Sequence, residues 1–450
     1  MSAQDGRRSG RDRARTGPDG TRRPGRTTRT RPAALPSADV GRIVELEVGA
    51  PAHGGHCVAR FEGRVVFVRH SLPGERVQVR LTEAAPGASF WRGDTVEVLQ
   101  ASADRVESPW PEAGPGGAGG GELAHVALPA QRAWKAAVVA EQLARLAEIE
   151  WAVEVEAAPG DDERGGLAYR TRIELVTDAQ GRAGMHGHRS HDVVPLESMP
   201  LAVPALQELR LLERRWPADA RITAIAPVGG DRPLVLVNGE PWAGRGPDTR
   251  PAARTSVRER AVVGGRELTW RVAGTGFWQV HREAPTLLAQ AVLDAVAPVL
   301  EGRSAARLVD LYSGAGLLTL PLADAVGAGG HVVAVEGEAR AVSDARRNLH
   351  EHPWVDLRQG SVEDTLRDNA LGAADVVVLD PPRVGAGRRV LAEVAAMGPQ
   401  RVVHVACDPA SLARDVADLA ASGYRLTSLR ALDLFPMTHH VECVAVLDRH

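Results

Sequence analysis

The chain has 450 residues, of which 44% are hydrophobic and 25% are charged, and its formal net charge is −3. It is long enough for about two to four globular domains, and its near-neutral charge excludes a protein that attracts nucleic acid through its overall field. No apolar run is long enough for a membrane helix and no signal peptide is visible, so we expect a cytoplasmic protein with no membrane partner and no obligate protein partner.

The cysteine content argues against disulfides and metal sites. Cys57, Cys407 and Cys443 are widely separated and show no CxxC spacing, so we predict three free thiols and no metal. The positive charge is almost entirely arginine, since Lys135 is the only lysine.

Residues 1–37 hold ten arginines, three aspartates and no apolar periodicity. This composition predicts a disordered tail, because it cannot bury enough apolar surface to offset the entropy of ordering. Two interpretations remain open. The tail is either an electrostatic arm for RNA phosphates or an expendable, solvated extension.

Short runs of alternating apolar and polar residues occupy residues 38–100. Five of them are typical of strands, at residues 43–48, 56–61, 64–69, 76–82 and 95–99. Five short strands in about sixty residues predict a small closed β-barrel of the oligonucleotide-binding (OB) kind. The stretches 54–60, 65–68 and 72–75 resemble the TRAM domain, which implies an RNA-binding module.

The segment of residues 101–272 begins with a loop, because the run from Gly114 to Gly121 offers almost no side chains to pack. A helix is expected from about Pro129 to Ile149, with an apolar face. Strands are then expected at residues 170–177, 191–195, 221–226 and 233–237. This pattern predicts a central α+β domain, which we expect to bind RNA alongside the barrel.

Strands and helices alternate in residues 273–450, as in a Rossmann-like, doubly wound α/β sheet. The strand expected at residues 307–311 leads into Tyr312-Ser313-Gly314-Ala315-Gly316, where the glycines let a ligand approach the backbone. About twenty residues later a second strand ends in Glu336, whose carboxylate can accept both ribose hydroxyls of a nucleoside. The alternative is a glutamate that only caps the next helix.

Two nucleoside cofactors, NAD and S-adenosylmethionine, fit this pattern. The dehydrogenase fingerprint GxGxxG is incomplete, because Gly316 is followed by Leu317-Leu318-Thr319, and this favours S-adenosylmethionine. A later strand at residues 374–379 ends in Asp380-Pro381-Pro382-Arg383. The two prolines either merely stop the strand or also hold Asp380 at the edge of the cofactor crevice, which we favour.

Cys407 follows a strand expected at residues 401–406, at the sheet edge where ligands bind. Such a cysteine is often a core residue, but a helix that starts near Ser411 is expected to lower its pKa and make it a nucleophile. A thiolate can add to carbon 6 of a pyrimidine and activate carbon 5 for methylation. Glu442 is the candidate base for the carbon 5 proton, since a mostly apolar crevice would raise its pKa. We assign Cys443 to the core.

Residues 40–450 resemble the class I S-adenosylmethionine-dependent RNA 5-methyluridine methyltransferase family. The motifs that carry the resemblance are Phe277-Trp278-Gln279-Val280, Asp310 to Gly316, Asp380 to Arg383, Cys407-Asp408-Pro409 with Leu412 to Asp415, and His440-Val441-Glu442. The resemblance implies that Cys407 is the nucleophile and Glu442 the proton acceptor. It also implies a uridine flipped out of its helix and cofactor contacts, beside the Gly314 backbone, at Gln279, Tyr312, Glu336 and Asp380.

Three departures from the family pattern are visible. Members with a TRAM domain often carry a four-cysteine iron-sulfur site, but Ala118-Gly119-Gly120-Gly121 and Met199-Pro200 stand where cysteines are expected. We therefore predict no cluster. Leu317 replaces a frequent asparagine in the cofactor loop, and His281 stands where asparagine often follows the glutamine motif.

Two other classes of function remain open. A non-catalytic RNA-binding protein could keep this architecture but would not need Cys407 and Glu442 together. A methyltransferase that acts on an exocyclic nitrogen can also use an Asp-Pro-Pro segment and would not need the thiol. Within the preferred class, the TRAM-like segment favours ribosomal RNA as the substrate, with transfer RNA as the alternative.

Overall fold

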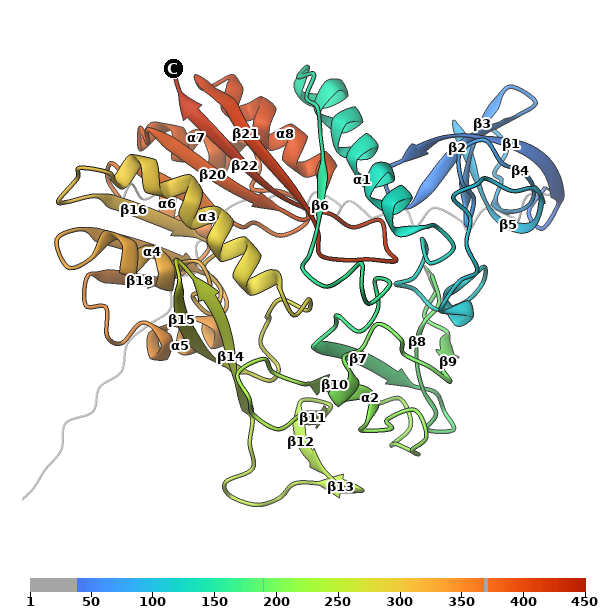
Figure 1. Ribbon diagram of the computed structural model, residues 1–450, viewed down its shortest axis with the longest axis horizontal. Helices are drawn as coiled ribbons and strands as arrows, with labels where there is room; N and C mark the ends of the chain where they lie inside the picture. The colour runs from blue at the N-terminus through green and yellow to red at the C-terminus, as the bar shows by residue number, and fades with distance from the viewer. Residues whose placement is uncertain (1–38, 189, 368–370) are drawn as a thin grey trace, which may run out of the picture.

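The computed structural model describes residues 39–188, 190–367 and 371–450. The tail predicted at residues 1–37 lies outside the described residues. Three large β-sheet bodies follow one another along the chain, with a barrel at one end and the C-terminal sheet at the other (Figure 1). This mixed α/β architecture with an N-terminal barrel confirms the predicted fold class.

The first body is a closed five-stranded barrel with the strand order β1-β2-β3-β5-β4. Its strands are β1 (Ile43–Ala52), β2 (His56–Phe61), β3 (Arg64–Arg69), β4 (Arg76–Glu83) and β5 (Phe90–Gln100). Alternate residues of β1 point inward, so that Val44, Leu46 and Val48 are buried. The strand expected at residues 95–99 begins earlier, at Phe90, because its first residues pair with β3. Pairing of β1 with β4 closes the barrel.

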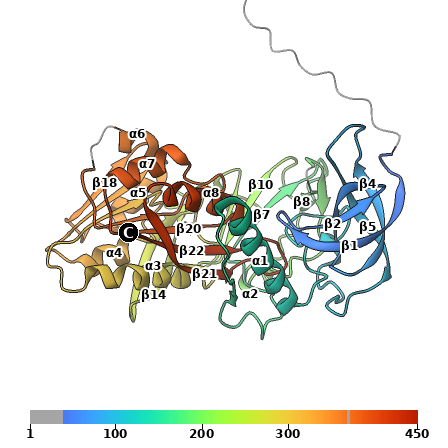
Figure 2. The ribbon, with the colours of Figure 1, turned by 90° about the horizontal axis from the view of Figure 1, so that it is seen from above.

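A helical connection leads from the barrel to the C-terminal sheet. It contains η1 (Pro111–Ala113), α1 (Leu128–Gln142), the π-helical turn η2 (Leu143–Ala147) and the strand β6 (Val155–Ala157). Pro129 suits the first turn of α1, where its missing N–H is not needed. Figure 2 shows α1 between the barrel and the C-terminal sheet, and β6 forms one edge of that sheet. The domain boundaries expected at residues 100 and 272 stay predictions. In the structure, α1 packs on the C-terminal sheet and β6 is a strand of it.

A buried ion pair fastens α1 to the C-terminal sheet. The Lys135 Nζ lies 2.5 Å from Oδ1 of Asp433 and donates to the carbonyl oxygen of Phe435 at 3.0 Å. Neither charged side chain is more than 2% exposed. Removing one partner would leave the other charge buried without compensation.

We therefore expect Lys135→Met to lower the free energy of unfolding by about 3–5 kcal/mol. Arg132→Met, on the same helix, breaks a pair with the mostly exposed Asp162 and should cost less than about 1 kcal/mol. Urea unfolding of both variants measures the difference. Equal losses in the two variants would show that the buried pair does not fasten the helix.

The central body is a seven-stranded antiparallel sheet with the order β13-β12-β11-β10-β7-β8-β9. Its elements are β7 (Arg172–Thr177), β8 (Ala183–His186), β9 (Val193–Pro195), α2 (Pro204–Gln207), β10 (Arg221–Ile225), β11 (Leu234–Val237), β12 (Glu240–Ala243) and β13 (Gly246–Pro247). The four strands predicted in this segment are present as β7, β9, β10 and β11. Its apolar residues pack around the buried Trp110 and Tyr169.

A hairpin that the sequence does not predict follows the central sheet. Its strands are β14 (Ser256–Val263) and β15 (Arg266–Ala273), which pair without a bulge. Gly264 and Gly265, both with positive φ, make the two-residue turn. The Nε1 of Trp270 on β15 donates to the carbonyl oxygen of Gly316 at 2.9 Å, so the hairpin supports the glycine loop.

The C-terminal body is an eight-stranded sheet with the order β18-β17-β16-β19-β20-β22-β21-β6. Its other elements are α3 (Ala284–Leu300), β16 (Arg307–Leu311), α4 (Thr319–Val326), β17 (His331–Glu336), α5 (Ala339–Asn348), β18 (Val355–Gln359), α6 (Val362–Arg367), β19 (Val376–Leu379), α7 (Arg388–Ala396), β20 (Arg401–Ala406), α8 (Pro409–Ala420), β21 (Tyr424–Asp433) and β22 (Glu442–Arg449). Strands β16 to β20 are parallel, and β22 runs antiparallel to both of its neighbours.

The strand order reverses between β16 and β19, because the chain first adds β17 and β18 on one side of β16 and then crosses to the other. Ligands of doubly wound sheets bind at such a switch point, beyond the carboxyl ends of the strands. The fold therefore places a ligand site beside Leu311 and Leu379. Within the described ranges, no helix is both long and apolar enough to cross a bilayer.

Candidate active site

A cavity of about 1340 Å³ opens at the carboxyl ends of β16, β19 and β20. The residues predicted for the site all line it: Gln279, Tyr312, Gly314, Glu336, Asp380, Cys407 and Glu442. They come from separate strand ends and loops, so the fold is what brings them together. Their individual roles stay predictions.

The loop after β16 presents its backbone to the cavity. Tyr312, Gly314 and Gly316 have φ angles of 65°, 56° and 89°, a region that glycine adopts freely. A Cβ on Gly314 would meet nothing within 4 Å, so this backbone faces open space. Glu336 accepts hydrogen bonds from the N–H groups of Gly314 at 2.9 Å and Glu338 at 2.7 Å. It thereby holds the loop and keeps further lone pairs for a ligand.

Two buried polar atoms next to the loop lack a hydrogen-bond partner among the described residues. Asp310 is buried, and its Oδ2 accepts from Oγ1 of Thr319 at 2.5 Å. Its Oδ1 and the Oγ of Ser313 have no hydrogen-bond partner among the described residues. An unsatisfied buried polar atom costs about 1–3 kcal/mol. Ser313 and Glu336 are among the described residues that line the cavity, whereas Asp310 is not. Glu336 therefore offers the carboxylate that suits the hydroxyl groups of a nucleoside cofactor such as S-adenosylmethionine.

Asp380 lies at the end of β19, across the switch point from the glycine loop. Burial raises its pKa to about 7, and His404 offsets part of that rise. Burial likewise raises the pKa of Asp310 to about 7. The two carboxyl groups are therefore partly protonated near neutral pH, when they can donate as well as accept hydrogen bonds.

Cys407 and Glu442 lie at adjacent strand ends. Strands β20 and β22 are antiparallel, and Ala406 is opposite Cys443, so the next residues toward the cavity are Cys407 and Glu442. Asp408 accepts from the backbone N–H of Ser411 at 2.8 Å and caps α8. The order of β20, Cys407 and the start of α8 is thus the predicted one.

The prediction that α8 lowers the pKa of Cys407 is wrong. Burial, followed by the Glu442 carboxylate, raises the pKa of the thiol to about 12, and the positive charge of Arg383 offsets only part of that rise. Loss of water around the sulfur outweighs the partial charge of a helix end. Burial and the charge of Asp380 also raise the pKa of Glu442 well above its usual value, in the predicted direction.

Cys443, His281 and Leu317 differ in where their side chains lie. Cys443 is buried in the apolar cluster beneath the sheet, as predicted. The Nε2 of His281 lies 3.0 Å from Oδ2 of Asp161, and its ring stacks on Tyr169. His281 is not among the described residues that line the cavity, whereas Leu317 is.

Apolar side chains pack at the positions where related proteins often carry iron-sulfur cysteines. Ala118 and Met199 belong to the cluster around the buried Trp110, and a Cβ on Gly121 would lie 2.9 Å from the Trp110 ring. The three cysteines of the whole chain are too few for four thiolate ligands. The residues present do not fit such a cluster.

The cavity also contains residues for which the sequence predicts no individual role. Phe277 is 76% exposed at the cavity, and Arg383 and His440 line its wall. The available signal was their membership in the Phe-Trp-Gln, Asp-Pro-Pro-Arg and His-Val-Glu motifs. Glu122 and His439, which are not among the described residues that line the cavity, belong to no sequence motif that indicates a role.

The fold and the cavity together define a class, namely an α/β enzyme with a nucleoside-cofactor site at its switch point. Family models match three stretches: the TRAM domain at residues 38–90, the methyltransferase small domain at residues 288–402, and tRNA (Uracil-5-)-methyltransferase at residues 365–450.

Full-length relatives identify the family. An uncharacterized RNA methyltransferase of Streptomyces coelicolor is 44% identical over 443 residues, which cover 93% of this chain and 95% of the relative. Another, from Bifidobacterium longum, is 43% identical and covers 90% of this chain and 96% of its own length. The chain belongs to the family of TRAM-domain RNA methyltransferases, as the resemblance of its motifs predicts.

A solved structure shares the fold. The tRNA (uracil-54, C5)-methyltransferase of Pyrococcus abyssi, in complex with S-adenosyl-L-homocysteine, matches with a TM-score of 0.62 and 21% identity. The match covers 89% of this chain and 100% of that chain.

Proposed function

We propose that the protein methylates carbon 5 of uridine in RNA and takes the methyl group from S-adenosylmethionine. The observation that carries this proposal is the pairing of Cys407 with Glu442 at adjacent strand ends, in the same cavity as the Gly314 loop. A nitrogen methyltransferase or a non-catalytic RNA-binding protein needs no thiol beside a buried carboxyl group.

Five residues are proposed to hold the cofactor. Glu336 accepts the ribose hydroxyls, and the Gly314 backbone and the Tyr312 side chain lie along the nucleoside. Asp380 and Gln279 line the same cavity as this loop and Cys407. When bound, S-adenosylmethionine supplies an electrophilic methyl group on a positively charged sulfur.

The side chains of the cavity carry the remaining chemistry. The Cys407 thiolate forms a bond from Sγ to carbon 6 of a flipped uridine, and the electron pair of the 5,6 double bond makes carbon 5 nucleophilic. After carbon 5 has gained the methyl group, Glu442 takes its proton. The electron pair left behind restores the double bond, and the Sγ to carbon 6 bond breaks.

We expect the addition step to become faster as the pH rises. Because the pKa of Cys407 is raised to about 12, the thiolate fraction grows about tenfold per pH unit below that value. The rate of covalent addition to 5-fluorouridine RNA, measured at about pH 6.5 and about pH 8.5, should therefore increase. A rate that falls over this interval would contradict the assignment of Cys407 as nucleophile.

We propose ribosomal RNA as the first substrate class, by analogy with the TRAM-type barrel. Transfer RNA is the second candidate, because the family model that matches residues 365–450 is named for transfer RNA. Purified protein is incubated with S-adenosylmethionine and with 5-fluorouridine-substituted RNA of each class, and covalent complexes are separated on denaturing gels. Fluorine at carbon 5 cannot leave as a proton does, so the adduct persists. No adduct with either RNA, in protein that binds the cofactor, would favour the nitrogen methyltransferase.

A further inference from the structure

The loop that leads to Glu442 is held by residues from much earlier in the chain. The Leu123 N–H donates to the carbonyl oxygen of Met437 at 2.9 Å, and the Gln131 side chain accepts from the Met437 N–H at 2.7 Å. The Tyr169 hydroxyl donates to the carbonyl oxygen of Pro436 at 3.1 Å. The connection after the barrel and Tyr169 therefore hold the loop of residues 434–441, called the catalytic loop below, in place.

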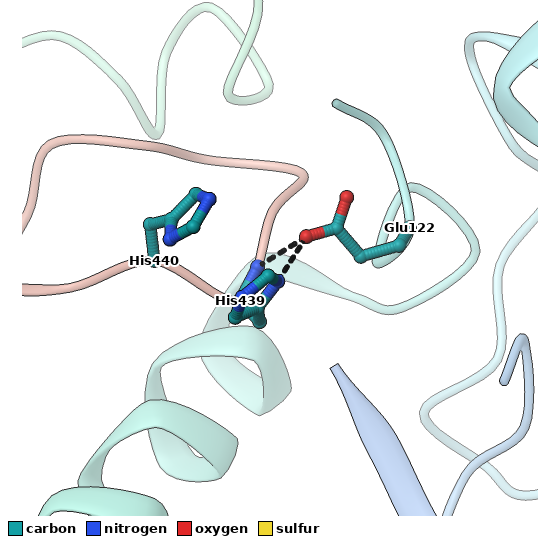
Figure 3. A group of neighbouring side chains, drawn as sticks. All are labelled: Glu122, His439 and His440. Carbon is teal, nitrogen blue, oxygen red and sulfur yellow. Dashed lines mark hydrogen bonds and ion pairs between the residues drawn. The ribbon is translucent and has the colours of Figure 1, made fainter. Parts of the chain in front are cut away.

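Glu122 contacts the same loop at His439, which is closer to Glu442 in the sequence than Met437 and Pro436 are. Its Oε1 accepts from the His439 backbone N–H at 3.1 Å and also bonds the ring Nδ1 of His439 (Figure 3). Burial alone would raise the pKa of Glu122, but its hydrogen bonds to His439 hold that pKa well below its usual range. Glu122 is therefore a buried carboxylate whose main partner is His439.

The contact continues from His439 to the cavity. The rings of His439 and His440 lie with their centroids 4.1 Å apart. The Nε2 of His440 is 3.4 Å from Nη2 of Arg383, and Arg383 lines the cavity. Burial lowers the pKa of His440 to about 3, so its ring is neutral and can accept the Arg383 N–H.

Arg383 matters because its charge acts on both reacting groups. Its charge opposes the rise in pKa that burial causes at Cys407 and at Glu442. A displaced guanidinium would leave the thiolate less stabilised and the base with a higher pKa.

The barrel touches the same place. A Cβ on Gly55, in the turn between β1 and β2, would lie 3.0 Å from Cγ of Glu122 and 3.2 Å from Nδ1 of His439. In that turn, His53 Nε2 also lies 2.7 Å from Oδ2 of Asp408, the residue after Cys407. The Glu122 and His439 side chains thus fill the space between the barrel and the catalytic loop.

A metal ion is the competing interpretation, since Glu122, His439 and His440 offer ligand atoms within 4.8 Å of one another. Two features argue against it. A neutral His440 that accepts at Nε2 carries its proton on Nδ1 and has no second lone pair for a metal. The Arg383 guanidinium, 3.4 Å from that ring nitrogen, would also repel a cation.

We propose that Glu122 and His439 form a positioning pair. Glu122 holds the His439 ring, that ring holds His440, and His440 aims Arg383 at Cys407 and Glu442. The inference rests on the proposed function and adds two positioning residues to it. Neither Glu122 nor His439 is among the described residues that line the cavity, so we expect the pair to act on the rate of chemistry rather than on substrate affinity.

The test uses Glu122→Gln, His439→Gln and the double variant in the full chain. Each change is close to isosteric, and the glutamine at position 122 keeps an acceptor oxygen while losing the charge. We expect kcat to fall about 10- to 100-fold, and KM for RNA and for S-adenosylmethionine to stay within about twofold. The rate of 5-fluorouridine adduct formation should fall in parallel. The double variant should be no slower than the slower single variant, because both act through one contact.

Arg132→Met is the matched control, since it breaks an exposed pair on α1 without reaching the catalytic loop. Rates are compared well below the unfolding midpoint of each variant. Unchanged kcat in the folded variants, or losses that multiply in the double variant, would overturn the positioning role. So would one zinc ion per purified wild-type chain that is absent from His439→Gln. If the wild-type chain forms no adduct, the proposed function itself fails, and the inference fails with it.

Discussion

Cys407→Ala is expected to lower the rate of methyl transfer to RNA by about a thousandfold or more. Carbon 5 of uridine is a poor nucleophile until a bond forms at carbon 6, and Cys407, which lines the cavity, is the proposed nucleophile for that bond. Cofactor affinity should change by less than about twofold, because the Gly314 loop and Glu336 are left intact. Transfer of a labelled methyl group measures the rate, and equilibrium dialysis measures the affinity.

Cys443→Ala is the matched control for this variant. Cys443 lies next to Glu442 in sequence, but its side chain is buried in the cluster beneath the sheet. Removing the sulfur should lower the free energy of unfolding by about 1 kcal/mol and leave the rate unchanged below the unfolding midpoint. A Cys407→Ala enzyme that keeps the rate of the control would rule out the thiolate mechanism.

The second large effect is expected for Glu442→Gln, which should stall the enzyme after methyl transfer. Glutamine cannot take the carbon 5 proton, so the Sγ to carbon 6 bond cannot break, and turnover should fall about 10²- to 10⁴-fold. The addition step should not slow down, because the Glu442 carboxylate adds to the rise in the Cys407 pKa that burial causes. Protein covalently bound to ordinary RNA should therefore accumulate.

Denaturing gels and mass spectrometry of the digested complex measure this accumulation. The peptide that contains Cys407 should carry a methylated uridine. Asp408→Asn is a suitable comparison, since Asp408 caps α8 and contacts His53 without reaching the proton to be removed. A Glu442→Gln enzyme that turns over normally, or that forms no covalent complex, would show that another group removes the proton.

The sequence predicts the catalytic body well because its signals are local. One strand leads into the glycine turn at Asp310 to Gly316, and the next strand ends in the acidic residue Glu336. Because these strands are parallel, their carboxyl ends lie at the same edge of the sheet. Cys407 follows the end of β20 and Glu442 begins β22, and because these two strands are antiparallel, both residues lie at the same edge of the sheet. The barrel is likewise predicted from short alternating strands, apart from the early start of β5.

The remaining features depend on contacts between distant parts of the chain. The edge strand β6 is a short pattern whose partner, β21, lies far along the chain. The hairpin of β14 and β15 is an exception, because it pairs locally around Gly264 and Gly265, and its alternating strands with a Gly-Gly turn were a signal that the prediction missed. Glu122 and His439 are 317 residues apart, so neither segment alone reveals their contact. The direction of the Cys407 pKa shift was wrong because it was inferred from a helix end, whereas burial and a neighbouring carboxylate decide it.

The most direct test of uridine carbon 5 methylation through Cys407 uses RNA that carries tritium at carbon 5 of its uridines. Wild-type protein, S-adenosylmethionine and the labelled RNA are incubated, and tritium released into water is compared with 5-methyluridine in the digested RNA. We expect one tritium released per methyl group gained, and no release by Cys407→Ala. Methyl groups on a base nitrogen with the tritium retained would contradict the proposed function.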